Sequence, residues 1–419
     1  MDKTLKNKIK NKIIVEYRGL LYDEHLNADK LKKTVLEVTN SIIAAEQQSL
    51  SEEDKKRLIE EVINDFLGLG EMELFLRDPA ITEIMINGPK KVYIEKNGKK
   101  TLSGVTFEDD THLMRIIYKI LAPTRRRVDE SSPFTDVSLE DGSRVNIIIP
   151  PLALDGPTMT VRKFSKELKT ADDLVTLGTL DTRMKDFLVA SIMAKMNIIF
   201  SGPTGAGKTT TLNVFSSYIS NDQRIITIED TAELRLSQEQ VVRLEAKPAN
   251  MEGKGEVTIR DLFKNSLRMR PDRIILGEIR GAEALDMLQA VCSGHKGSLV
   301  VIHGNSARDV IYRLETIILI SGVPISLEVI QRQISSAIHL IVHQEQLPDG
   351  SRKIMSISQV SGLKEGQVVL EDIFVYDFEG LDSAGKAKGR WRATGVLPVF
   401  FPLFKKAGVN ISEDLFVKG

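Results

Sequence analysis

The chain has 419 residues, and its 57 basic and 58 acidic side chains give a formal net charge of −1. This length is too great for one hydrophobic core and predicts two or three domains, while the cancelling charges give no protein-wide field to hold a polyanion, so direct nucleic-acid binding is not expected. Because Cys292 is the sole cysteine, a disulfide framework and a cysteine-rich zinc site are excluded, as is typical of a reducing cytoplasm.

The sequence has no apolar run approaching the ~20 residues that a membrane-spanning helix needs. The basic start, residues 1–12, lacks the apolar segment of a secretion signal. We therefore expect a protein that is neither exported nor membrane-spanning by itself. The lysines of this start favour a solvated, frayed terminus over contact with an anionic membrane.

Residues 1–68 are predicted to form a helical N-terminal segment. Apolar residues recur at helical spacing from Leu31 to Ile42, and Ser51 is placed to cap a second helix, with Asp54 as a weak capping-box partner. The apolar stripe of this second helix favours core packing over a partner-binding face.

Residues 69–164 are predicted to form an α+β domain, because short strand patterns surround one helical pattern. The strands are Glu83–Ile86, Lys91–Glu95, Val145–Ile149 and Met159–Arg162, and the helix is Asp110–Leu121. The polar residues 165–176 show no strand pattern and are expected to be an interdomain linker.

Residues 177–376 are predicted to form an α/β domain, because strands and helices alternate there in a way that indicates a mainly parallel sheet covered on both faces. Its expected strands are Asn197–Phe200, Arg224–Glu229, Arg273–Gly277 and Leu299–Ile302, followed by a hairpin of Ala337–His343 and Lys353–Val360 around Asp349 and Gly350. In the tail, residues 377–419, the stretch Gly380–Gly389 is expected to be mobile and Trp391–Phe404 to pack on the rest.

A phosphate-binding loop lies between the first of these strands and a helical pattern. It consists of Gly202, Pro203, Thr204, Gly205, Ala206, Gly207, Lys208 and Thr209 and is followed by Thr210. The glycines let backbone N–H groups wrap a phosphate at the positive end of the following helix. Lys208 is expected to reach the β- and γ-phosphates of ATP, and the Thr209 hydroxyl to ligate Mg²⁺.

Three further segments carry side chains suited to nucleotide chemistry. The strand ending in Glu229 is followed by Asp230 and Glu233, and such carboxylates could accept a proton from water or hold Mg²⁺ through water. The strand Arg273–Gly277 resembles a Walker B strand, with Gly277 where many relatives have aspartate and Glu278 next to it. His295 and His303 stand at the two ends of another strand and could contact the γ-phosphate.

The ordered motifs are similar to those of the type II/IV secretion (traffic) ATPase superfamily, and most like its CpaF branch, which powers Tad-type pili. The similarity extends from about Gly68 to Val375. Besides the phosphate loop it rests on Leu69–Glu73, Thr82–Gly88, Arg126–Pro133, Asp141–Asn146, Ile149–Gly156, Thr160–Phe164, Ile228–Glu233, Leu276–Arg280 and His303–Ser306.

The resemblance implies a RecA-like P-loop motor domain behind an N-terminal α+β domain, assembled into a ring that is expected to be a hexamer. It implies Glu233 as general base, Glu278 as the Walker B glutamate, and His295 and His303 as the histidine box. Arg144 and Arg162 match the arginines that neutralise phosphate charge, a role that the planar fork of arginine suits. Arg125–Arg127 are weaker candidates for that role.

Two departures favour the CpaF branch or the related conjugative ATPases. The acidic box reads Asp230-Thr-Ala-Glu233 without proline, and the four-cysteine zinc element of other pilus motors cannot be built from one cysteine. The resemblance therefore implies an ATP-hydrolysing motor at the cytoplasmic face of the membrane. It would act on polytopic inner-membrane platform proteins to assemble pili, and whether it also retracts them stays open.

Several alternatives stay open at this stage. The motor could serve type IV secretion or conjugation, or the chain could be a nucleotide-sensing scaffold with little turnover. A small-molecule kinase would need an acceptor site or lid that the sequence does not indicate. Among Glu229, Glu233 and Glu278 the residues alone do not single out the base.

Overall fold

The computed structural model describes residues 3–17, 28–45, 50–67, 69, 72–96, 98–124, 126–139, 141–163, 170–249 and 253–418. The chain divides into two compact units. The first takes in Met1–Lys96, Lys100–Leu139 and Arg144–Lys163, and the second the remaining residues, chiefly Phe164–Gly419. Among the helices in the described ranges, none is both long and apolar enough to cross a bilayer.

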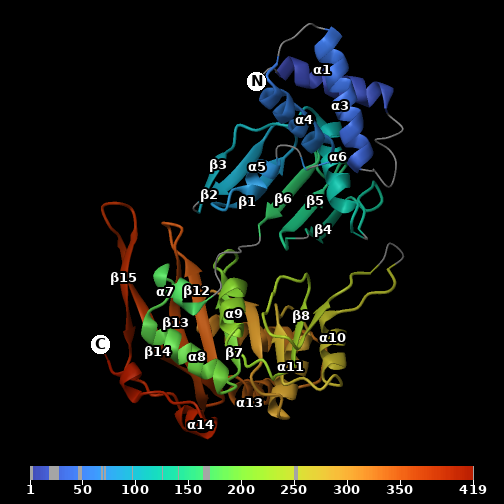
Figure 1. The fold of residues 1–419 in the computed structure, drawn as a ribbon. Coiled ribbons are helices and arrows are strands. Elements are labelled where there is room, and N and C mark those ends of the chain that lie inside the picture. The colour runs from blue at the N-terminus through green and yellow to red at the C-terminus, as the bar shows by residue number, and fades with distance from the viewer. Residues whose placement is uncertain are drawn as a thin grey trace. The chain divides into compact units, whose positions relative to one another are not determined.

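The first unit begins with helices α1 (Lys3–Glu16), α3 (Ala28–Ala45) and α4 (Glu52–Leu67), drawn in blue in Figure 1. They share one hydrophobic cluster, to which α1 contributes Leu5, Ile9 and Ile13. The prediction of helices is confirmed, but that of a frayed start is wrong. The three buried residues recur every four positions and bury one face of α1 despite the intervening lysines.

The start of α4 follows the predicted cap. The Asp54 N–H donates to Ser51 Oγ at 3.1 Å, and the Ser51 hydroxyl donates to Asp54 Oδ2 at 2.6 Å. One otherwise unsatisfied helix N–H is thereby paired.

The rest of the first unit is a six-stranded sheet with two helices. The sheet order is β3-β2-β1-β6-β5-β4, and the pairs β1·β2, β1·β6, β5·β6 and β4·β5 are antiparallel. The elements are α5 (Met72–Arg77), β1 (Ile81–Asn87), β2 (Val92–Lys96), β3 (Lys99–Leu102), α6 (Asp110–Leu121), β4 (Phe134–Ser138), β5 (Arg144–Ile148) and β6 (Thr158–Arg162). The sequence did not reveal α5, β3 or β4. All four residues of β3 are exposed, so it lacks the apolar alternation that marks a half-buried strand.

The second unit is built on a nine-stranded sheet of order β15-β14-β13-β12-β7-β11-β10-β8-β9, in which β12 to β9 are parallel and β13 to β15 antiparallel. Its strands are β7 (Ile198–Gly202), β8 (Ile225–Glu229), β9 (Val241–Glu245), β10 (Arg273–Leu276), β11 (Leu299–His303), β12 (Leu340–Gln346), β13 (Arg352–Lys364), β14 (Gln367–Leu381) and β15 (Ala387–Ala393). β9 was not predicted.

Helices cover both faces of this sheet (Figure 1). Alternate residues of β7 show why: Ile198 and Phe200 pack with α8 and α9, whereas Ile199 packs with α10 to α13. The prediction of an α/β domain with a mainly parallel sheet is thus confirmed. The helices are α7 (Ala171–Thr176), α8 (Thr182–Met193), α9 (Lys208–Ser216), α10 (Ile259–Ser266), α11 (Glu283–Cys292), α12 (Ala307–Ile320), α13 (Leu327–Ala337), α14 (Phe401–Lys406) and the 3₁₀ turn η1 (Glu413–Phe416).

The predicted linker 165–176 ends in ordered structure. Thr170 caps α7 in a reciprocal capping box with Asp173, and Ala171 and Leu174 are buried in the core of the second unit. Residues 164–169 lie outside the described residues. The polar surface of this short helix hid its two buried positions from the sequence pattern.

The tail is also more ordered than expected. Gly380–Gly389, expected to be mobile, contains the end of β14 and the start of β15, which pair as a hairpin. The aromatic residues after it pack on the core, with Phe404 and Phe416 against Phe187 at ring separations of 6.2 and 5.3 Å. The hairpin predicted at Asp349 and Gly350 is confirmed, although Ala337 ends α13 instead of starting a strand.

His339 precedes β12 and is held neutral by its surroundings. The Asn197 N–H donates to His339 Nδ1 at 3.2 Å. Burial, with a smaller contribution from Lys296, lowers the pKa of His339 from 6.5 to about 4. A protonated ring would also lose the Asn197 hydrogen bond, because both ring nitrogens would be donors.

We predict that His339 makes the second unit sensitive to acid. Since its pKa is lower in the folded protein, the stabilisation is complete above pH 6.5 and is lost as the pH falls through about 4. Wild type should lose unfolding free energy as the pH is lowered from 7.5 to 4.5. In His339→Asn this loss should be about 2–3 kcal/mol smaller, because asparagine keeps a hydrogen-bond acceptor but does not titrate. The loss is measured by urea unfolding, followed by the fluorescence of Trp391, the single tryptophan. His112→Asn, in the first unit, is the control, and an unchanged pH dependence in His339→Asn contradicts the assignment.

Candidate nucleotide-binding site

The phosphate loop joins β7 to α9 with the backbone that its glycines permit. Gly205 and Gly207 have φ of 82° and 92°, in the left-handed region that other residues avoid. Gly202 has a different reason to be glycine, because a Cβ there would lie 2.0 Å from the carbonyl oxygen of Gln344. The loop therefore depends on close backbone packing as well as on glycine torsions.

Lys208 points back into the loop and is largely buried. Its Nζ donates to the Pro203 carbonyl at 2.9 Å and lies 3.3 Å from Nδ1 of His303. It is the first residue of α9, whose N-terminal N–H groups and dipole favour an anion at this position. The half-buried Thr209 follows directly. This arrangement is suited to a phosphate group.

A chain of polar contacts leads from Lys208 across the sheet. The Glu278 carboxylate lies 3.1 Å from His303 Nε2 and 2.6 Å from Arg280 Nη2. Arg280 Nη1 in turn lies 3.2 Å from Asp230 Oδ2. Because β7, β11, β10 and β8 are parallel neighbours, their carboxyl ends meet at one edge, and all these groups gather there.

His303 connects the lysine to the glutamate through its two ring nitrogens. Burial and the charge of Lys208 lower the pKa of His303, although Glu278 acts in the opposite direction. An ammonium group can only donate, so the neutral ring accepts at Nδ1 and donates from Nε2 to Glu278. A change at the Lys208 ammonium can thus be transmitted to Glu278.

Glu229 organises the acidic box instead of facing solvent. It is buried, and its carboxylate accepts N–H bonds from Glu233 at 2.8 Å and Leu234 at 3.0 Å. Desolvation nevertheless raises the pKa of Glu229 to about 7. A Cβ on Gly277 would lie 2.7 Å from Glu229 Cγ, so the glycine at the Walker B position makes room for this side chain. The half-buried Glu233 is therefore held at its backbone by Glu229.

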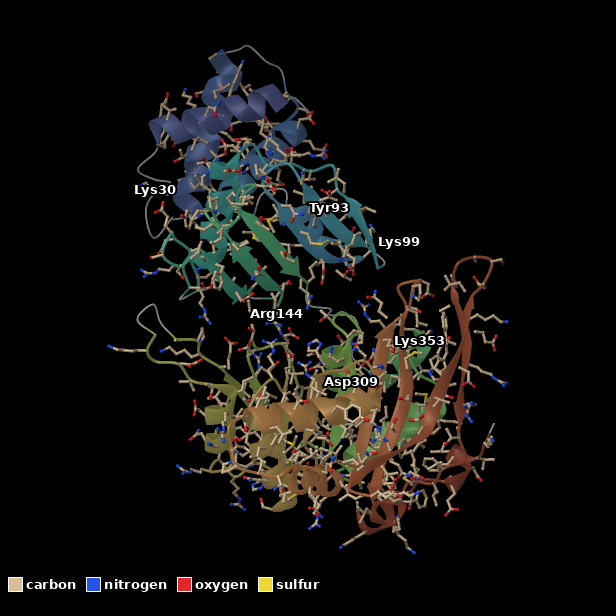
Figure 2. All side chains as sticks on the ribbon, turned by 180° about the vertical axis from the view of Figure 1, so that it is seen from behind. Lys30, Tyr93, Lys99, Arg144, Asp309 and Lys353 are labelled. Atoms are coloured by element: carbon tan, nitrogen blue, oxygen red, sulfur yellow. The ribbon has the colours of Figure 1, made fainter. Side chains whose placement is uncertain are left out.

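The two candidate arginines lie together on the first unit. Arg144 at the start of β5 (Figure 2) is the register partner of Arg162 at the end of β6. Arg162 Nε donates to Glu83 Oε1, on the next strand, at 2.9 Å. Directly opposed like charges are unfavourable in a sheet. Glu83 offsets part of that repulsion.

His295 does not join the site of its own chain. It precedes β11, whereas His303 ends it, so the five-residue strand separates the two histidines by ~15 Å. His295 instead lines a surface hollow of about 420 Å³ at the opposite edge, with Lys195, Asp272 and Lys296. The expectation that both histidines contact one γ-phosphate is wrong within a single subunit. One strand cannot place both its ends at the same edge.

Sequence reasoning missed two residues that contact the phosphate loop. The Arg352 side chain donates from Nε to the Gly205 carbonyl at 2.9 Å, and Gln344 Oε1 accepts from the Thr211 hydroxyl at 2.7 Å. Both belong to the β12–β13 hairpin, far along the chain. The run of polar residues that ends an otherwise apolar strand, 343–346, was the available signal.

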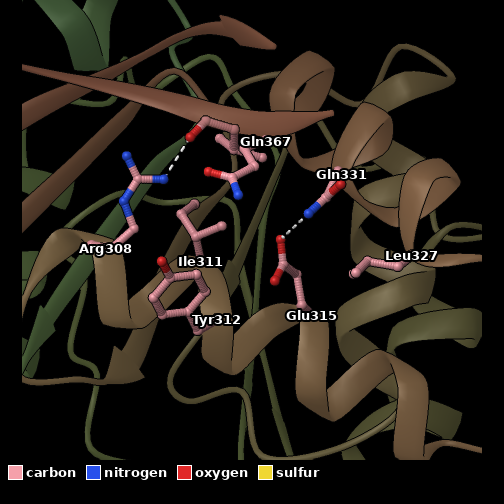
Figure 3. Close-up of a pocket in the computed structure, with 8 residues that line it drawn as sticks. Arg308, Ile311, Tyr312, Glu315, Leu327, Gln331 and Gln367 are labelled. Atoms are coloured by element: carbon pink, nitrogen blue, oxygen red, sulfur yellow. Dashed lines mark hydrogen bonds between the residues drawn. The ribbon is translucent and has the colours of Figure 1, made fainter. Parts of the chain in front are cut away.

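A second hollow, of about 200 Å³, lies between α12, α13 and the start of β14 (Figure 3). Arg308 bridges α12 to β14 by donating to the Val368 carbonyl at 2.6 Å, and Gln331 donates to Glu315 at 3.0 Å. None of the nucleotide motifs contributes a residue to it. These two hydrogen bonds connect the three elements.

The residues present fit a magnesium ion that is bound together with a nucleotide. Within the described ranges, no group of three His, Cys, Asp or Glu side chains could hold a metal by itself. Mg²⁺ is commonly held by one or two protein groups plus substrate phosphates and water. The Thr209 hydroxyl at the end of the loop, with Glu278 nearby in the network, provides such a partial set.

The comparisons with known proteins show the family of the chain. A family model described as "Type II/IV secretion system protein" matches residues 67–399, so the chain belongs to that family, the type II/IV secretion ATPase superfamily. The conjugal transfer protein TrbB of Rhizobium radiobacter is 30% identical over 313 residues, covering 74% of this chain and 92% of that protein. The type IV secretion system protein VirB11 of Brucella suis biovar 1 is 30% identical over 296 residues, covering 64% and 82%. The solved structure of the ATPase DotB of Legionella pneumophila is 20% identical, covers 71% and 80%, and has a TM-score of 0.49.

We predict that Glu229 destabilises the second unit at alkaline pH. Its pKa is raised on folding, so its favourable contribution is complete below pH 4.5 and is lost as the pH rises through about 7. Between pH 5 and 8, wild type should lose about 2–3 kcal/mol of unfolding free energy that Glu229→Gln retains, since glutamine can still accept the N–H bonds. Urea unfolding read from Trp391 fluorescence measures the difference. Glu239→Gln, at an exposed position, should behave as wild type, and identical profiles for Glu229→Gln exclude a titrating Glu229.

Proposed function

We propose that this protein hydrolyses ATP with Mg²⁺ and uses the cycle to drive a secretion or pilus machine. The observation that carries the proposal is the continuous set of contacts from Lys208 through His303 and Glu278 to Arg280 and Asp230. These contacts connect the phosphate loop to residues at the carboxyl ends of β11, β10 and β8. Family membership supports the same activity.

In this proposal each group has one role in the attack of water on the γ-phosphorus. Lys208 binds the β- and γ-phosphates, and Thr209 would hold Mg²⁺, which would neutralise phosphate charge. Glu233 orients the water and takes its proton as the bond between the γ-phosphorus and the β–γ bridging oxygen breaks, leaving ADP and phosphate. Glu278, oriented by His303 and Arg280, acts near the metal.

We propose Glu233 as the base because it lies on the turn that follows β8, at the edge of the sheet where the phosphate loop follows β7. The resemblance to the family implies the same role for this position. The Glu233 N–H is held there by the buried Glu229.

Arg144 and Arg162 are proposed to stabilise phosphate charge in an assembled ring, which we propose to be a hexamer. They are register partners, so both side chains start from the same end of the β5–β6 pair. Arginine binds phosphate through two parallel N–H donors, which suits them to this role.

We propose that the work is done at the cytoplasmic face of the membrane on polytopic platform proteins of a Tad-type pilus. The proline-free acidic box and the single cysteine favour the CpaF branch or the related conjugative ATPases over other pilus motors, and the ordered motifs are most like those of the CpaF branch. A second candidate is a type IV secretion or conjugation motor, favoured by the 30% identity to TrbB. Adjacent pilin genes would support the first candidate, and relaxase and coupling-protein genes the second.

Lys208→Ala is expected to abolish ATP hydrolysis, because it removes the cation that holds the β- and γ-phosphates. Phosphate release from the purified oligomer with ATP and Mg²⁺ is the measurement. Lys364→Ala, at an exposed position in β13, should retain wild-type turnover. If Lys208→Ala still hydrolyses ATP, the loop is not the catalytic site. If the wild type binds ATP without releasing phosphate, the protein is a nucleotide-sensing scaffold and not a motor.

Glu233→Gln is expected to lower turnover by about 10²–10⁴-fold with ATP binding largely intact, because the amide cannot accept the proton of water. Single-turnover hydrolysis and equilibrium binding of ATP with Mg²⁺ separate the two effects. Glu239→Gln serves as the matched control. Normal turnover in Glu233→Gln moves the role of base to Glu229 or Glu278.

A further inference from the structure

We propose that Arg352 is a positioning residue that fixes the phosphate loop in its nucleotide-binding conformation. The inference rests on the proposed ATPase function and adds a residue that lies 147 positions after the loop residue it contacts. Arg352 begins β13, directly after the turn that joins it to β12. No nucleotide-binding motif in the sequence includes it.

The Arg352 side chain contacts the loop at two of its glycines. Its Nε donates to the Gly205 carbonyl at 2.9 Å. Its Cδ lies 3.0 Å from the position that a Cβ on Gly207 would occupy. The side chain thus fills the space left by one glycine and holds the backbone of another.

The planarity of the peptide bond connects this contact to phosphate binding. In a trans peptide, the carbonyl of one residue and the N–H of the next point in opposite directions. Arg352 holds the Gly205 oxygen by this hydrogen bond, so the Ala206 N–H points the opposite way. There it donates to the Pro203 carbonyl at 3.3 Å, the same oxygen that accepts from Lys208. A phosphate oxygen in the loop would compete for this N–H and for the ammonium.

The β12–β13 hairpin holds the loop at other points as well. The Gln344 carbonyl oxygen closes on Gly202 at the start of the loop, and its side chain accepts from Thr211 in the first turn of α9. Beneath the loop, His343 bridges Ser201 and Glu345 with two contacts of 3.0 Å. The middle of the loop is held by Arg352. Without Arg352 the Gly205–Ala206 peptide would lose the bond to its carbonyl oxygen and would keep the Ala206 N–H bond to Pro203.

A positioning role differs in its kinetics from a direct catalytic role. The loop wraps the β-phosphate, which ADP and ATP share. Loss of loop geometry should therefore weaken both nucleotides alike. An arginine that stabilised the transferred γ-phosphate would instead lower kcat and leave the affinity for ADP unchanged.

The test compares wild type, Arg352→Ala and Arg352→Lys in the full-length oligomer. We expect the Kd of Mg·ADP and of a non-hydrolysable Mg·ATP analogue to rise by about tenfold in Arg352→Ala, as for a lost charge-assisted hydrogen bond. The kcat at saturating ATP should change by less than about threefold, since the chemistry would be intact once the loop is filled. Arg352→Lys keeps the charge without the Nε–H, so it should show most of the same loss. Arg332→Ala, an exposed arginine paired with Glu328 on α13, is the control.

Three results overturn the proposal. These are unchanged affinity in both Arg352 variants, a fall in kcat with unchanged ADP affinity, and full affinity in Arg352→Lys, which would reduce the role to charge alone. Trp391 fluorescence and urea unfolding report whether Arg352→Ala is folded. If Arg352→Ala does not fold, the affinities of the conservative variant Arg352→Lys decide the test. A wild type that binds neither nucleotide refutes the proposed function first, and so the two failures are distinguishable.

Discussion

The site depends on the buried ammonium of Lys208. A charge removed from water is costly unless polar partners or an opposite charge compensate it. The Pro203 carbonyl and the His303 ring supply part of that compensation, and the α9 terminus adds positive potential of its own. The loop is therefore a concentrated positive site whose natural complement is a polyphosphate. The same ammonium is the first member of the chain of contacts that leads to the acidic residues, so phosphate binding and acid-base chemistry are physically connected.

That connection follows from the strand order. β7, β11, β10 and β8 are parallel neighbours, so the loop, His303, Glu278 and Asp230 stand side by side although they are separated widely in sequence. In the proposed cycle a γ-phosphate would draw Lys208 away from His303, and the imidazole would then change its hydrogen bond with Glu278, which Arg280 also contacts. Such a sequence of small rearrangements is the kind of local change that a motor amplifies.

The sequence predicted the features that are encoded locally. The apolar runs of the central strands, the Ser51 cap, α6 and the glycines of the loop are all recognisable from short-range patterns, and the structure contains them. What it could not predict arises from pairing across long separations. Arg352 reaches Gly205 only because β12 lies beside β7. His295 was misjudged for a different reason: the two histidines stand at opposite ends of one strand, and that spacing already separates them. Gly380–Gly389 looked mobile because a strand exposed on both faces carries little apolar alternation.

The contact between Glu229 and Gly277 shows that the acidic box and the Walker B strand are not independent parts. Glu229 can be buried only because residue 277 has no side chain, and its carboxylate then fixes the N–H groups of Glu233 and Leu234. The position of Glu233 in the loop after β8 thus depends on Gly277, which directly follows β10. Since β10 also leads into Glu278, one strand controls both carboxylates. A side chain at position 277 would therefore displace Glu229 and alter the turn that carries the proposed base, even though Gly277 itself is not proposed to contact the nucleotide.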